Sequence, residues 1–499
     1  MTPLLLGIDA GGTVTKAAIF DAAGHERAVA GAHVATSHPR PGRVELDPEA
    51  LWQATVDAIR SVLATNGVAP EDIVAVGCTG YGNGGFLLDG DGRPAAPGVV
   101  STDARTDAIA AELAARPDAG AITERTGQPL RASSTLALLA WFAREAPEIA
   151  ARTRTVLLCK DYLRYRLTDA LASDLCDLSG GGLLDFGAGR PDPETLALVG
   201  LEGWAERLPP VYPSSAIGGR VTKAAAAATG LVAGTPVAVG TMDVEAVTLA
   251  SGVTDARHLS IAAGTWSINM LPSAQRAHGR LPVMQCRSRD GSGVLFVEGS
   301  PTSATNLAWF ARELLAGETD PYGTASALVA ALPPEACRVV YLPFIHGGEG
   351  APQASFVGLG QHCSRAHLLR ALFEGVAFQH RRHVDDLLAV AGDAQPVAAR
   401  LSGGAAQSAG WMQLFADVLE LPVEVARGSE LGALGSAICA SIAAGLHPDY
   451  DTAIAAMTRV DRRFEPDPER AVVYRRKHVT FRMVEDALAP VWPALGVTR

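Results

Sequence analysis

The chain has 499 residues, of which 48% are apolar and 19% are charged, and its formal net charge is −11. A chain of this length is expected to form at least two domains, and its composition is typical of a globular protein and excludes a disordered one. The acidic balance, without a basic arm or stripe to offset it, excludes a general nucleic-acid-binding protein.

No segment that would direct the chain to a membrane or out of the cell is expected. The N-terminal sequence MTPLLLGIDAGG has no basic n-region and only a short apolar run, so we predict no signal peptide. The most apolar later stretch, residues 431–446, is rich in small residues and shorter than the ~20 residues of a bilayer span, which predicts a buried core helix. The seven cysteines form no CxxC pair, which indicates free thiols in a reducing cytoplasm.

The first predicted elements form a β-meander. The strand LLLGID is followed by a glycine turn, by a second strand within TKAAIFDAAG and by a third strand, RAVAGAHVA. A helix is predicted next over residues 48–66, with Asp47 as its N-cap, Pro48 at its first position and Gly67 beyond its end. A buried strand, IVAVGCTG, and a hairpin with an Asp-Gly turn, GFLLDGDGRPA, follow.

The second half of the chain repeats this order of elements without repeating the sequence. HLSIAAGTWSINML predicts two strands around a Gly-Thr turn. VAARLSGGAAQSAGWMQLFADVLELPVEV predicts a strand, a Gly-Gly turn, a helix and a strand. The recurrence favours two similar domains, with a boundary near residues 245–255.

Four apolar strands end in small, mostly glycine-containing turns, at residues 4–16, 236–246, 259–267 and 399–408. Such turns let a phosphate approach the backbone N–H groups, because no side chain blocks the way. A nearby carboxylate, Asp9, can hold Mg²⁺ through water. The sequence has no GxxxxGK[ST] motif, and the opening β-meander excludes a Rossmann fold. Further phosphate donors would come from Thr13, Thr15, Lys16 and Thr265.

Asp243 follows the apolar run AVGTM and precedes the helix-compatible segment VEAVTLASG. One interpretation is an N-cap, because Asp is a favoured capping residue. The other is a general base at the end of a buried strand. Ala246 stands where a capping box would need Glu or Gln, so the pattern leaves both roles open, and the two are compatible.

Other candidate residues have structural interpretations beside the functional ones. Asp9 would stabilise its own hairpin turn, and Lys16 would be a solvated strand residue. His380 and His383 stand at i, i+3 in HRRH, and without a third ligand in sight a solvated helix face is favoured over a metal site. Helical positions predict core packing rather than sugar platforms for Trp52, Trp141, Trp309 and Trp411.

The order of these segments resembles that of the FGGY carbohydrate kinases, in the actin/hexokinase/Hsp70-like superfamily. GIDAGGTVTKAAIFDAAG is similar to the first phosphate hairpin of the family, and AAGTWS is similar to the second. KDYLRYRLTD is similar to a helix of the first domain, and GTMDVEAVTLASG to the segment with the catalytic aspartate. The regions that begin at FVGLGQHCSRAHLL and LSGGAAQSAGWMQLF are similar to the C-terminal signature, so the resemblance spans almost the whole chain.

The resemblance implies an α/β fold of two RNase H-like, actin-like domains with a nucleotide cleft between them. Residues 1–248 would form the N-terminal domain, with the sugar site, the first phosphate hairpin and the catalytic aspartate. Residues 249–499 would form the C-terminal domain, with the second phosphate hairpin and the adenosine site. Family members use MgATP to phosphorylate a terminal hydroxyl of a sugar or polyol, which implies ATP and Mg²⁺ as cofactors.

The resemblance also implies a role for each matched position. Asp243 would be the base, and would therefore contact the sugar, and Asp9 would orient Mg²⁺ through water. The β- and γ-phosphates would meet Gly11, Gly12, Thr13 and Lys16. The second phosphate clip would consist of Gly264 and Thr265. The adenosine would be bordered by Gly403, Gly404 and Ser408.

The sugar would lie above the strand end AVGCTGYGNGGFLL, where neither the Arg-Glu pair of glycerol kinases nor the Met-His-Gly pattern of xylulose kinases stands. Neutral groups there suit an uncharged polyol or ketose, whereas a sugar acid would need a cation, for which Arg105 is the candidate. Asp103, in the same loop as Arg105, would bind sugar hydroxyls or cap the following helix. The matched substrate contacts are Tyr81, Gly82, Asn83 and Gly84.

Within the family, DAGGTVTK, GNGGFLLDGDGRP, MDVEAVTLASG and AAGTW are most similar to L-xylulose (3-keto-L-gulonate) kinases. The similarity implies a small ketose or polyol as substrate, with a pentulose such as L-xylulose as the first choice and erythritol or another polyol as the alternative. The run FIHGGEGAP, residues 344–352, departs from the Gly-Glu-Arg-x-Pro pattern of the family on the nucleotide side.

A non-kinase ATPase or a sugar sensor of the same fold is the alternative from a different class. A sensor would add a DNA-binding helix-turn-helix, for which we expect no room before Leu4, and a pseudokinase would lack the base that Asp243 supplies. The expected partner is a small sugar or polyol, without nucleic acid or membrane, and a homodimer is left open.

Overall fold

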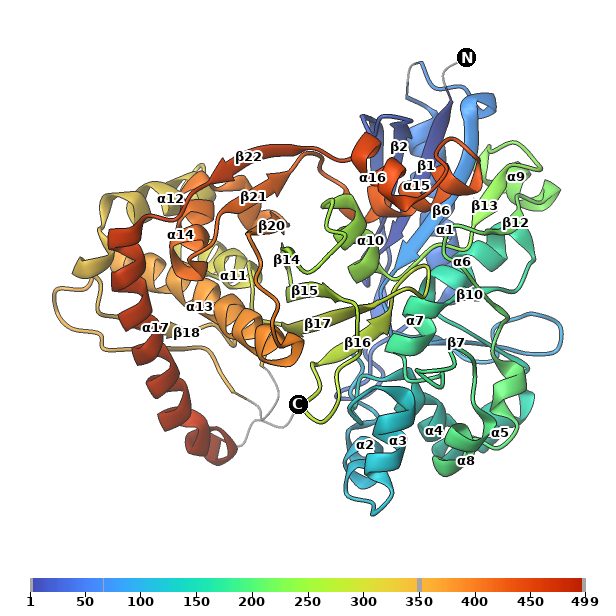
Figure 1. Ribbon diagram of the computed structural model, residues 1–499, viewed down its shortest axis with the longest axis horizontal. Coiled ribbons are helices and arrows are strands. Elements are labelled where there is room, and N and C mark those ends of the chain that lie inside the picture. Colours follow the sequence, from blue (N-terminus) through green and yellow to red (C-terminus); the bar gives the residue numbers. More distant parts are fainter. Residues whose placement is uncertain (1–2, 66, 348–351, 496–499) are drawn as a thin grey trace. The chain divides into compact units, whose positions relative to one another are not determined.

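The computed structural model describes residues 3–65, 67–347 and 352–495 (Figure 1). The chain divides into two compact units, neither of which is continuous in sequence. The first unit comprises Met1–Thr254, Pro272–Phe296 and Gly428–Arg459, and the second comprises Asp255–Leu271, Val297–Arg427 and Val460–Arg499. The segment FIHGGEGAP lies partly outside the described residues, at positions 348–351.

The main sheet of the first unit has six strands in its described part: β1 (Leu4–Ala10), β2 (Val14–Asp21), β3 (Glu26–His33), β6 (Ile73–Gly80), β12 (Ile217–Arg220) and β13 (Pro236–Ala238). Their order is β12-β13-β6-β1-β2-β3. β2 is antiparallel to both β1 and β3, so the predicted meander is confirmed. β6 lies parallel to β1, and β13 parallel to β6. The carboxyl ends of β1, β6 and β13 therefore share one edge of the sheet.

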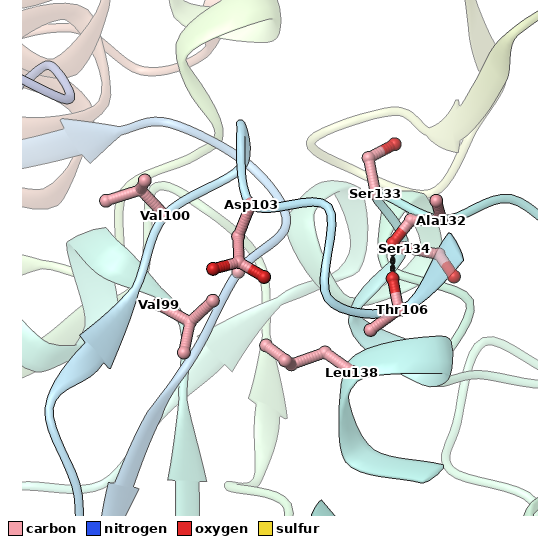
Figure 2. A pocket seen from close by; sticks show the side chains of 9 residues that line it. Val99, Val100, Asp103, Thr106, Ala132, Ser133, Ser134 and Leu138 are labelled. Carbon is pink, nitrogen blue, oxygen red and sulfur yellow. Dashed lines mark hydrogen bonds between the residues drawn. The ribbon is translucent and has the colours of Figure 1, made fainter. Parts of the chain in front are cut away.

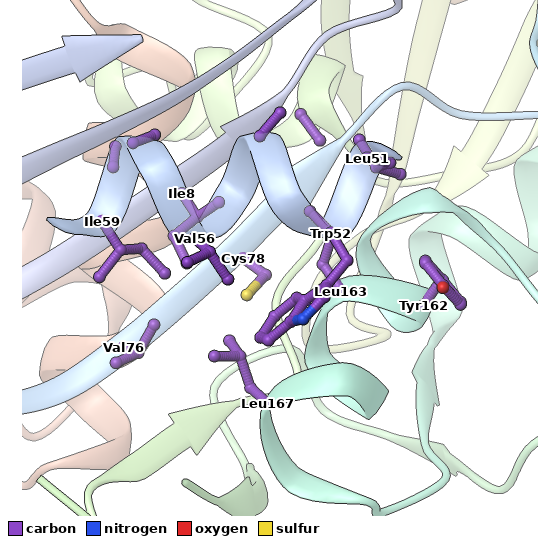
Figure 3. Packing of buried hydrophobic residues seen from close by; sticks show 14 of the residues in the cluster. Ile8, Leu51, Trp52, Val56, Ile59, Val76, Cys78, Tyr162, Leu163 and Leu167 are labelled. Carbon is purple, nitrogen blue, oxygen red and sulfur yellow. The ribbon is translucent and has the colours of Figure 1, made fainter. Parts of the chain in front are cut away.

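One face of this sheet packs against α1 (Pro48–Leu63) and α6 (Cys159–Thr168). Strand alternation directs Ile8 to this face, where it joins Trp52 and Val76 in one apolar cluster (Figure 3). Trp52 is buried, as predicted.

The predicted start of α1 is confirmed. Asp47 is the N-cap, because its carboxylate accepts from Glu49 N, and Pro48 occupies the first turn. The helix ends at Leu63, earlier than predicted, and Asn66 lies outside the described residues.

The opposite face of the sheet is covered by α15 (Leu431–Ala443), the buried helix expected from its small residues. A Cβ on Gly7 would lie 2.0 Å from Ala433 O, and a Cβ on Gly77 would lie 2.0 Å from Ser436 O. Glycine at these two positions is what permits the helix backbone to lie this close to β1 and β6.

A second apolar core of the first unit lies among helices that follow β6 in the sequence. The helices are α2 (Asp107–Ala114), α3 (Ala119–Thr126), α4 (Thr135–Glu145), α5 (Pro147–Arg152), α7 (Leu175–Gly180) and α8 (Pro193–Leu198). The predicted hairpin after Gly85 is smaller than expected. β7 (Phe86–Leu88) ends in a turn closed by a single bridge between Leu88 and Pro94, and its longer partner is β9 (Thr155–Leu157).

The remaining elements of the first unit are short. Three more helices are α9 (Lys223–Thr229), α10 (Asp243–Ala250) and α16 (Tyr450–Met457). The other strands are β4 (Thr36–Ser37), β5 (Glu45–Leu46), β8 (Gly98–Val99), β10 (Ser173–Asp174), β11 (Val211–Tyr212) and β16 (Met284–Arg287).

The second large sheet has the order β16-β17-β15-β14-β20-β21-β22. Its further strands are β14 (His258–Ala263), β15 (Ser267–Ser273), β17 (Val294–Ser300), β20 (Ala398–Ser402), β21 (Val423–Ala426) and β22 (Val460–Phe464). β14 and β15 form the predicted hairpin, and the predicted strand–turn–helix–strand is confirmed as β20, α14 (Ala409–Leu419) and β21. β14 and β20 are parallel neighbours, so their glycine turns lie at one sheet edge.

The helices of the second unit surround the 27-residue α13. They are α11 (Thr305–Leu314), α12 (Pro321–Ala331), α13 (Arg365–Ala391), α14 and α17 (Pro468–Leu488), and a small hairpin consists of β18 (Val340–Leu342) and β19 (Ser355–Val357). Trp411 is buried on α14 as predicted, whereas Trp141 and Trp309 are only partly buried. Within the described residues, none of the helices combines the length and the apolarity of a bilayer span.

Candidate active site

The turn between β1 and β2 holds the first group of predicted phosphate-binding residues. Gly11 N donates to Val14 O (3.0 Å), and Val34 N donates to Thr13 O (2.9 Å), which fixes the loop from both sides. A Cβ added at Gly12 would meet nothing within 4 Å, so the tip of the turn is open. Thr13 is exposed beside it, and the buried Thr15 hydroxyl has no hydrogen-bond partner among the described residues. An open, glycine-containing turn with free hydroxyls is suited to a phosphate.

Asp9 lies at the end of β1, directly opposite Lys16 of β2. Burial raises the pKa of the Asp9 carboxyl to about 6, although the neighbouring Lys16 lowers it. Lys16 Nζ is 2.8 Å from Glu430 Oε2, and the negative charge of Glu430 raises the Asp9 pKa further. The sequence interpretation missed Glu430, whose place beside Lys16 depends on the docking of α15.

Asp243 is the first residue of α10, and Met242 is the N-cap. The N-cap interpretation is therefore wrong by one position, but the carboxylate still accepts from Val244 N at 2.7 Å. Burial, and then the charge of Asp9, raises the pKa of Asp243 to about 7. Both residues are only partly buried, so the end of β1 and the start of α10 are not sealed within the core.

The charge of Asp9 raises the pKa of Asp243, so a divalent cation held near Asp9 would relieve the cost of ionising both carboxyl groups. In the described part of the chain no cluster of three or more His, Cys, Asp or Glu could hold a metal ion. Magnesium bound through water, one or two carboxylates and substrate phosphates needs no such cluster. The residues present therefore fit a Mg²⁺–nucleotide complex.

The loop after β6 lies against the segment before Asp243. A Cβ on Gly82 would lie 1.9 Å from Met242 Sδ, so the backbone of this loop lies directly against the Met242 side chain. Asn83 has a positive φ of 64°, and its buried Oδ1 has no hydrogen-bond partner among the described residues. The buried Tyr81 hydroxyl is likewise without an oxygen or nitrogen partner there and lies beside the Cys159 thiol. Unpartnered buried polar atoms are what a sugar hydroxyl would satisfy.

Asp103 lines a small open pocket with Gly84, Val99, Val100, Thr106 and residues 132–134 and 138 (Figure 2). Its carboxylate accepts from Val44 N (2.6 Å) and from the backbone, Nε and Nη2 of Arg105. These four donors match the acceptor capacity of a carboxylate. Asp103 does not cap the next helix, because the N-cap of α2 is Thr106.

Arg105 is equally committed to protein partners. Its Nη2 also donates to Glu45 Oε1 at 2.7 Å, and its guanidinium stacks on Trp141, 5.0 Å from the ring centroid. The side chain is only 3% exposed. The charge of Arg105, the candidate cation for a sugar acid, is therefore neutralised by the carboxylates of Asp103 and Glu45.

The second unit holds the other predicted nucleotide-binding residues. Gly264 and Thr265 form the turn between β14 and β15, where Ala304 N donates to Gly264 O (2.9 Å) and the Thr305 hydroxyl donates to Thr265 O (3.2 Å). A Cβ added at Gly264 would meet nothing within 4 Å, so this turn is also open.

Gly403 and Gly404 follow β20 and lie next to that turn. Gly403 has a φ of +90°, and a Cβ there would lie 2.7 Å from Ala263 C and 2.9 Å from Gly264 N. Ser408 is the N-cap of α14, where its hydroxyl accepts from Trp411 N (3.3 Å). The structure thus brings together Gly264, Thr265, Gly403 and Gly404 at one sheet edge.

A buried histidine network behind this edge was not anticipated. His380 and His383 were expected on a solvated face, but both are buried on α13, so that prediction is wrong. His380 contacts Asn269 Oδ1 (2.8 Å) and Ser303 Oγ (3.0 Å), and His383 contacts Ser300 Oγ (2.8 Å). The partners come from distant parts of the sequence, so the local pattern HRRH carried no signal for them.

Comparison with known proteins shows which class of enzyme this fold and site define. Family models for the FGGY family of carbohydrate kinases match the chain, the N-terminal domain over residues 4–250 and the C-terminal domain over residues 259–444. The protein is a carbohydrate kinase. It belongs to the FGGY family, and the expected α/β fold of two actin-like domains is confirmed.

Similar proteins of known sequence and structure align with nearly the whole chain. The L-xylulose/3-keto-L-gulonate kinase of Escherichia coli (strain K12) is 32% identical over 495 residues, which cover 98% of each chain. The erythritol kinase of Brucella abortus (strain 2308) is 30% identical over 99% of this chain and 98% of its own. The crystal structure of xylulose kinase from Rhodospirillum rubrum aligns with a TM-score of 0.84 at 29% identity, over 98% of this chain and 99% of that one.

Proposed function

We propose that this enzyme transfers the γ-phosphoryl group of MgATP to a terminal hydroxyl of a small uncharged ketose or polyol, with L-xylulose as the first candidate. The observation that carries the proposal is the pair of partly buried residues Asp243 and Asp9, whose carboxyl pKa values burial raises to about 7 and about 6. The similarity to the L-xylulose/3-keto-L-gulonate kinase supports the choice of sugar.

Asp243 acts as the general base. In its ionised form it accepts the proton of the attacking hydroxyl, and a pKa near neutrality matches that task. The contact between Gly82 and Met242 puts the sugar-binding loop next to the base. Asn83 Oδ1, which has no hydrogen-bond partner among the described residues, and the Tyr81 hydroxyl, which lies beside the Cys159 thiol, then orient the substrate.

Phosphoryl transfer depends mainly on positioning and on charge neutralisation. Mg²⁺, when bound, would neutralise phosphate charge, and Asp9 would hold it through water. Backbone groups of Gly11, Gly12 and Thr13 and the Lys16 ammonium would bind the β- and γ-phosphates, with Gly264 and Thr265 as the second clip. Lys16 would exchange its partner Glu430 for phosphate. The adenosine would be bordered by Gly403, Gly404 and Ser408.

We further propose that an uncharged sugar is preferred to a sugar acid. Arg105 is already held by Asp103 and Glu45, so its charge is not available to a carboxylate. The same contacts leave Asp103 without a free acceptor position, which supports a structural role for it over the expected sugar contact. Erythritol is the alternative substrate, supported by the erythritol kinase relative.

The test is sugar-dependent ADP release measured with L-xylulose, erythritol and 3-keto-L-gulonate. L-Xylulose should give the highest kcat/KM, and the sugar acid the lowest. The product identified by mass spectrometry must be a sugar monophosphate. If no sugar raises ADP release above the ATPase background, the proposed transfer to a small uncharged ketose or polyol is overturned.

Three further expectations belong to this proposal. The enzyme acts in the cytoplasm, and a homodimer stays open beside a monomer. The boundary between residues 248 and 249, with a nucleotide cleft between the domains, stays a prediction. Limited proteolysis and light scattering would test the boundary and the oligomeric state.

A further inference from the structure

Lys160 lies at the centre of a buried cluster of charges in the first unit. Its Nζ is 2.7 Å from Asp161 Oδ1, 2.9 Å from Asp174 Oδ1 and 3.4 Å from Asp177 Oδ2, and all four side chains are fully buried. Arg164 adds a second cation, 3.8 Å from Asp161. Burial raises the pKa of Asp177 well above its ordinary value. The cluster thus sets two cations against three carboxyl groups, of which Asp177 is the one whose neutral form burial favours.

One member of the cluster, Asp174, reaches out of it. While its Oδ1 faces Lys160, its Oδ2 accepts from the hydroxyls of Thr241 (3.1 Å) and Ser214 (3.0 Å) and from Cys176 N (3.1 Å). An ionised acceptor makes these hydrogen bonds stronger than neutral ones. Asp174 therefore links Thr241 to the buried charged cluster.

The segment 239–242 connects β13 to α10 and lacks regular pairing. β13 is in register with β6 at one residue pair, Val237 with Val76. Gly240 N donates to Ser214 O (2.9 Å), and the Thr79 hydroxyl donates to Thr241 O (2.7 Å). A Cβ on Gly240 would lie 2.0 Å from Cys78 O. Side-chain hydrogen bonds and close packing thus hold residues 239–242 in place, because these residues are not part of a ladder of strand-to-strand hydrogen bonds.

We propose that Thr241, anchored by the Asp174–Lys160 pair, is the positioning residue that fixes the Asp243 carboxylate at the attacking hydroxyl. The inference rests on the proposed function of Asp243 as the base. Met242 alone separates the two residues, and the Asp243 carboxylate hydrogen-bonds within its own helix, to Val244 N. The position of the Asp243 carboxylate therefore depends on where α10 begins, and the hydrogen bond from Thr241 to Asp174 fixes the start of α10.

The energetic consequence is large for catalysis and small for the fold. A displacement of about 1 Å in a catalytic group can cost roughly 100-fold in rate. Removing the hydroxyl that donates to Asp174 takes away one hydrogen bond of a cluster whose other contacts remain. A positioning role and a merely structural role therefore predict different outcomes for kcat.

The experiment compares Thr241→Val, which keeps the shape but removes the donor, with Thr241→Ser, which keeps the donor. Thr55→Val is the matched control, because Thr55 is also fully buried in the first unit and its hydroxyl donates to Leu51 O within α1 (2.8 Å). For each variant we would measure kcat, KM for sugar and nucleotide, the pH profile of kcat, and hydrogen exchange of peptides covering residues 239–246.

We expect Thr241→Val to lower kcat roughly 10- to 100-fold with both KM values little changed. Its pH profile should shift, because the surroundings of Asp243 change, and exchange at residues 239–246 should accelerate. Thr241→Ser should restore kcat, and Thr55→Val should leave kcat and this exchange as in the wild type. Asp174→Asn is a second probe, and it should act in the same direction as Thr241→Val.

The inference is overturned if Thr241→Val keeps the wild-type kcat, or if Thr55→Val loses as much. If no sugar stimulates the wild type, the proposed function fails on its own, and hydrogen exchange then decides the positioning. Faster exchange at residues 239–246 in Thr241→Val than in Thr55→Val supports it, and equal exchange overturns it.

Discussion

The Asp9 carboxylate lies directly against the Cα of Gly432 in the first turn of α15. A Cβ built on Gly432 would fall 2.1 Å from Asp9 Oδ2, well inside van der Waals contact. The two residues are more than 400 positions apart in the sequence, yet one determines the space available to the other. The contact is possible because glycines on β1 and β6 admit the backbone of α15.

Gly432→Ala should therefore disable the enzyme. The added methyl group must displace either the Asp9 carboxylate or α15, so we expect kcat/KM to fall about 100-fold and the Mg²⁺ concentration for half-maximal rate to rise. The measurement is a Mg²⁺ titration of the initial rate.

Gly120→Ala is the control for this helix substitution. Gly120 lies in α3, where an added Cβ would meet nothing within 4 Å. We expect unchanged kinetics and a gain of up to about 1 kcal/mol in stability, since Ala is the better helix former. Wild-type kinetics and Mg²⁺ dependence in Gly432→Ala would contradict the role given to Asp9.

Asp243→Asn should abolish transfer and stabilise the fold. Removing the base should lower kcat about 10²–10⁴-fold, while nucleotide affinity measured by calorimetry stays close to that of the wild type. At pH 8 the native Asp243 is ionised beside Asp9, so a neutral amide removes repulsion and should add on the order of 1–3 kcal/mol.

The stability gain of Asp243→Asn should depend on pH with a definite sign. A carboxyl whose pKa is raised from 3.8 to about 7 binds more protons in the folded state, so it costs stability as pH rises between those values. The difference in Tm between variant and wild type should therefore shrink from pH 8 to pH 5. A difference in Tm that stays constant with pH would show that the charge of Asp243 does not cause the stability gain.

Local chemistry explains which elements were predictable. The meander, α1 with its Asp47 cap and the β14–β15 hairpin depend on periodicity and turn residues within a short window. Asp243 was found because it ends an apolar run, although it begins α10 instead of capping it.

Long-range packing explains what was missed. Glu430 and Gly432 reach Asp9 and Lys16 because α15 docks on β1. The small residues of 431–446 predicted a buried helix, but they do not indicate which strand it packs against. His380 was misjudged for the same reason, since its partners come from β15 and from the segment after β17. Polar side chains whose partners lie far away in the sequence cannot be told from surface residues by the local sequence pattern.

Activity should fall on the acid side of neutrality. Asp243 must be ionised to accept a proton, so kcat/KM for the sugar should rise with pH through about 7 and then level off. Below about 6 the decline should steepen, because Asp9 is protonated there as well. A bound cation favours the ionised carboxyls, so saturating MgATP should move the midpoint to lower pH.

The measurement for this profile is kcat/KM between pH 5.5 and 9, at limiting and at saturating MgATP. Asp243→Glu serves as a comparison, since it keeps a carboxylate but shifts its position. A flat profile over this range would show that neither carboxyl limits the rate.

The buried histidines should make the second unit sensitive to acid. Burial lowers the pKa of His383 to about 3 and that of His380 well below its ordinary value. Groups with a depressed pKa bind fewer protons in the folded state, so their contribution to stability is complete above pH 6.5 and is lost as pH falls below it. Each histidine should cost about 1.4 kcal/mol per pH unit in that range.

His383→Gln tests this, because glutamine can still hydrogen-bond to Ser300 but does not titrate. Glu298 and Arg382 are the charged groups near His383, and both are unchanged in the variant. We expect the variant to be less stable than the wild type at pH 7.5 and to lose less stability between pH 6.5 and 5, by calorimetry. His38→Gln, at an exposed position, should show the wild-type slope. Parallel slopes for all three proteins would mean that His383 is not the acid-sensitive group.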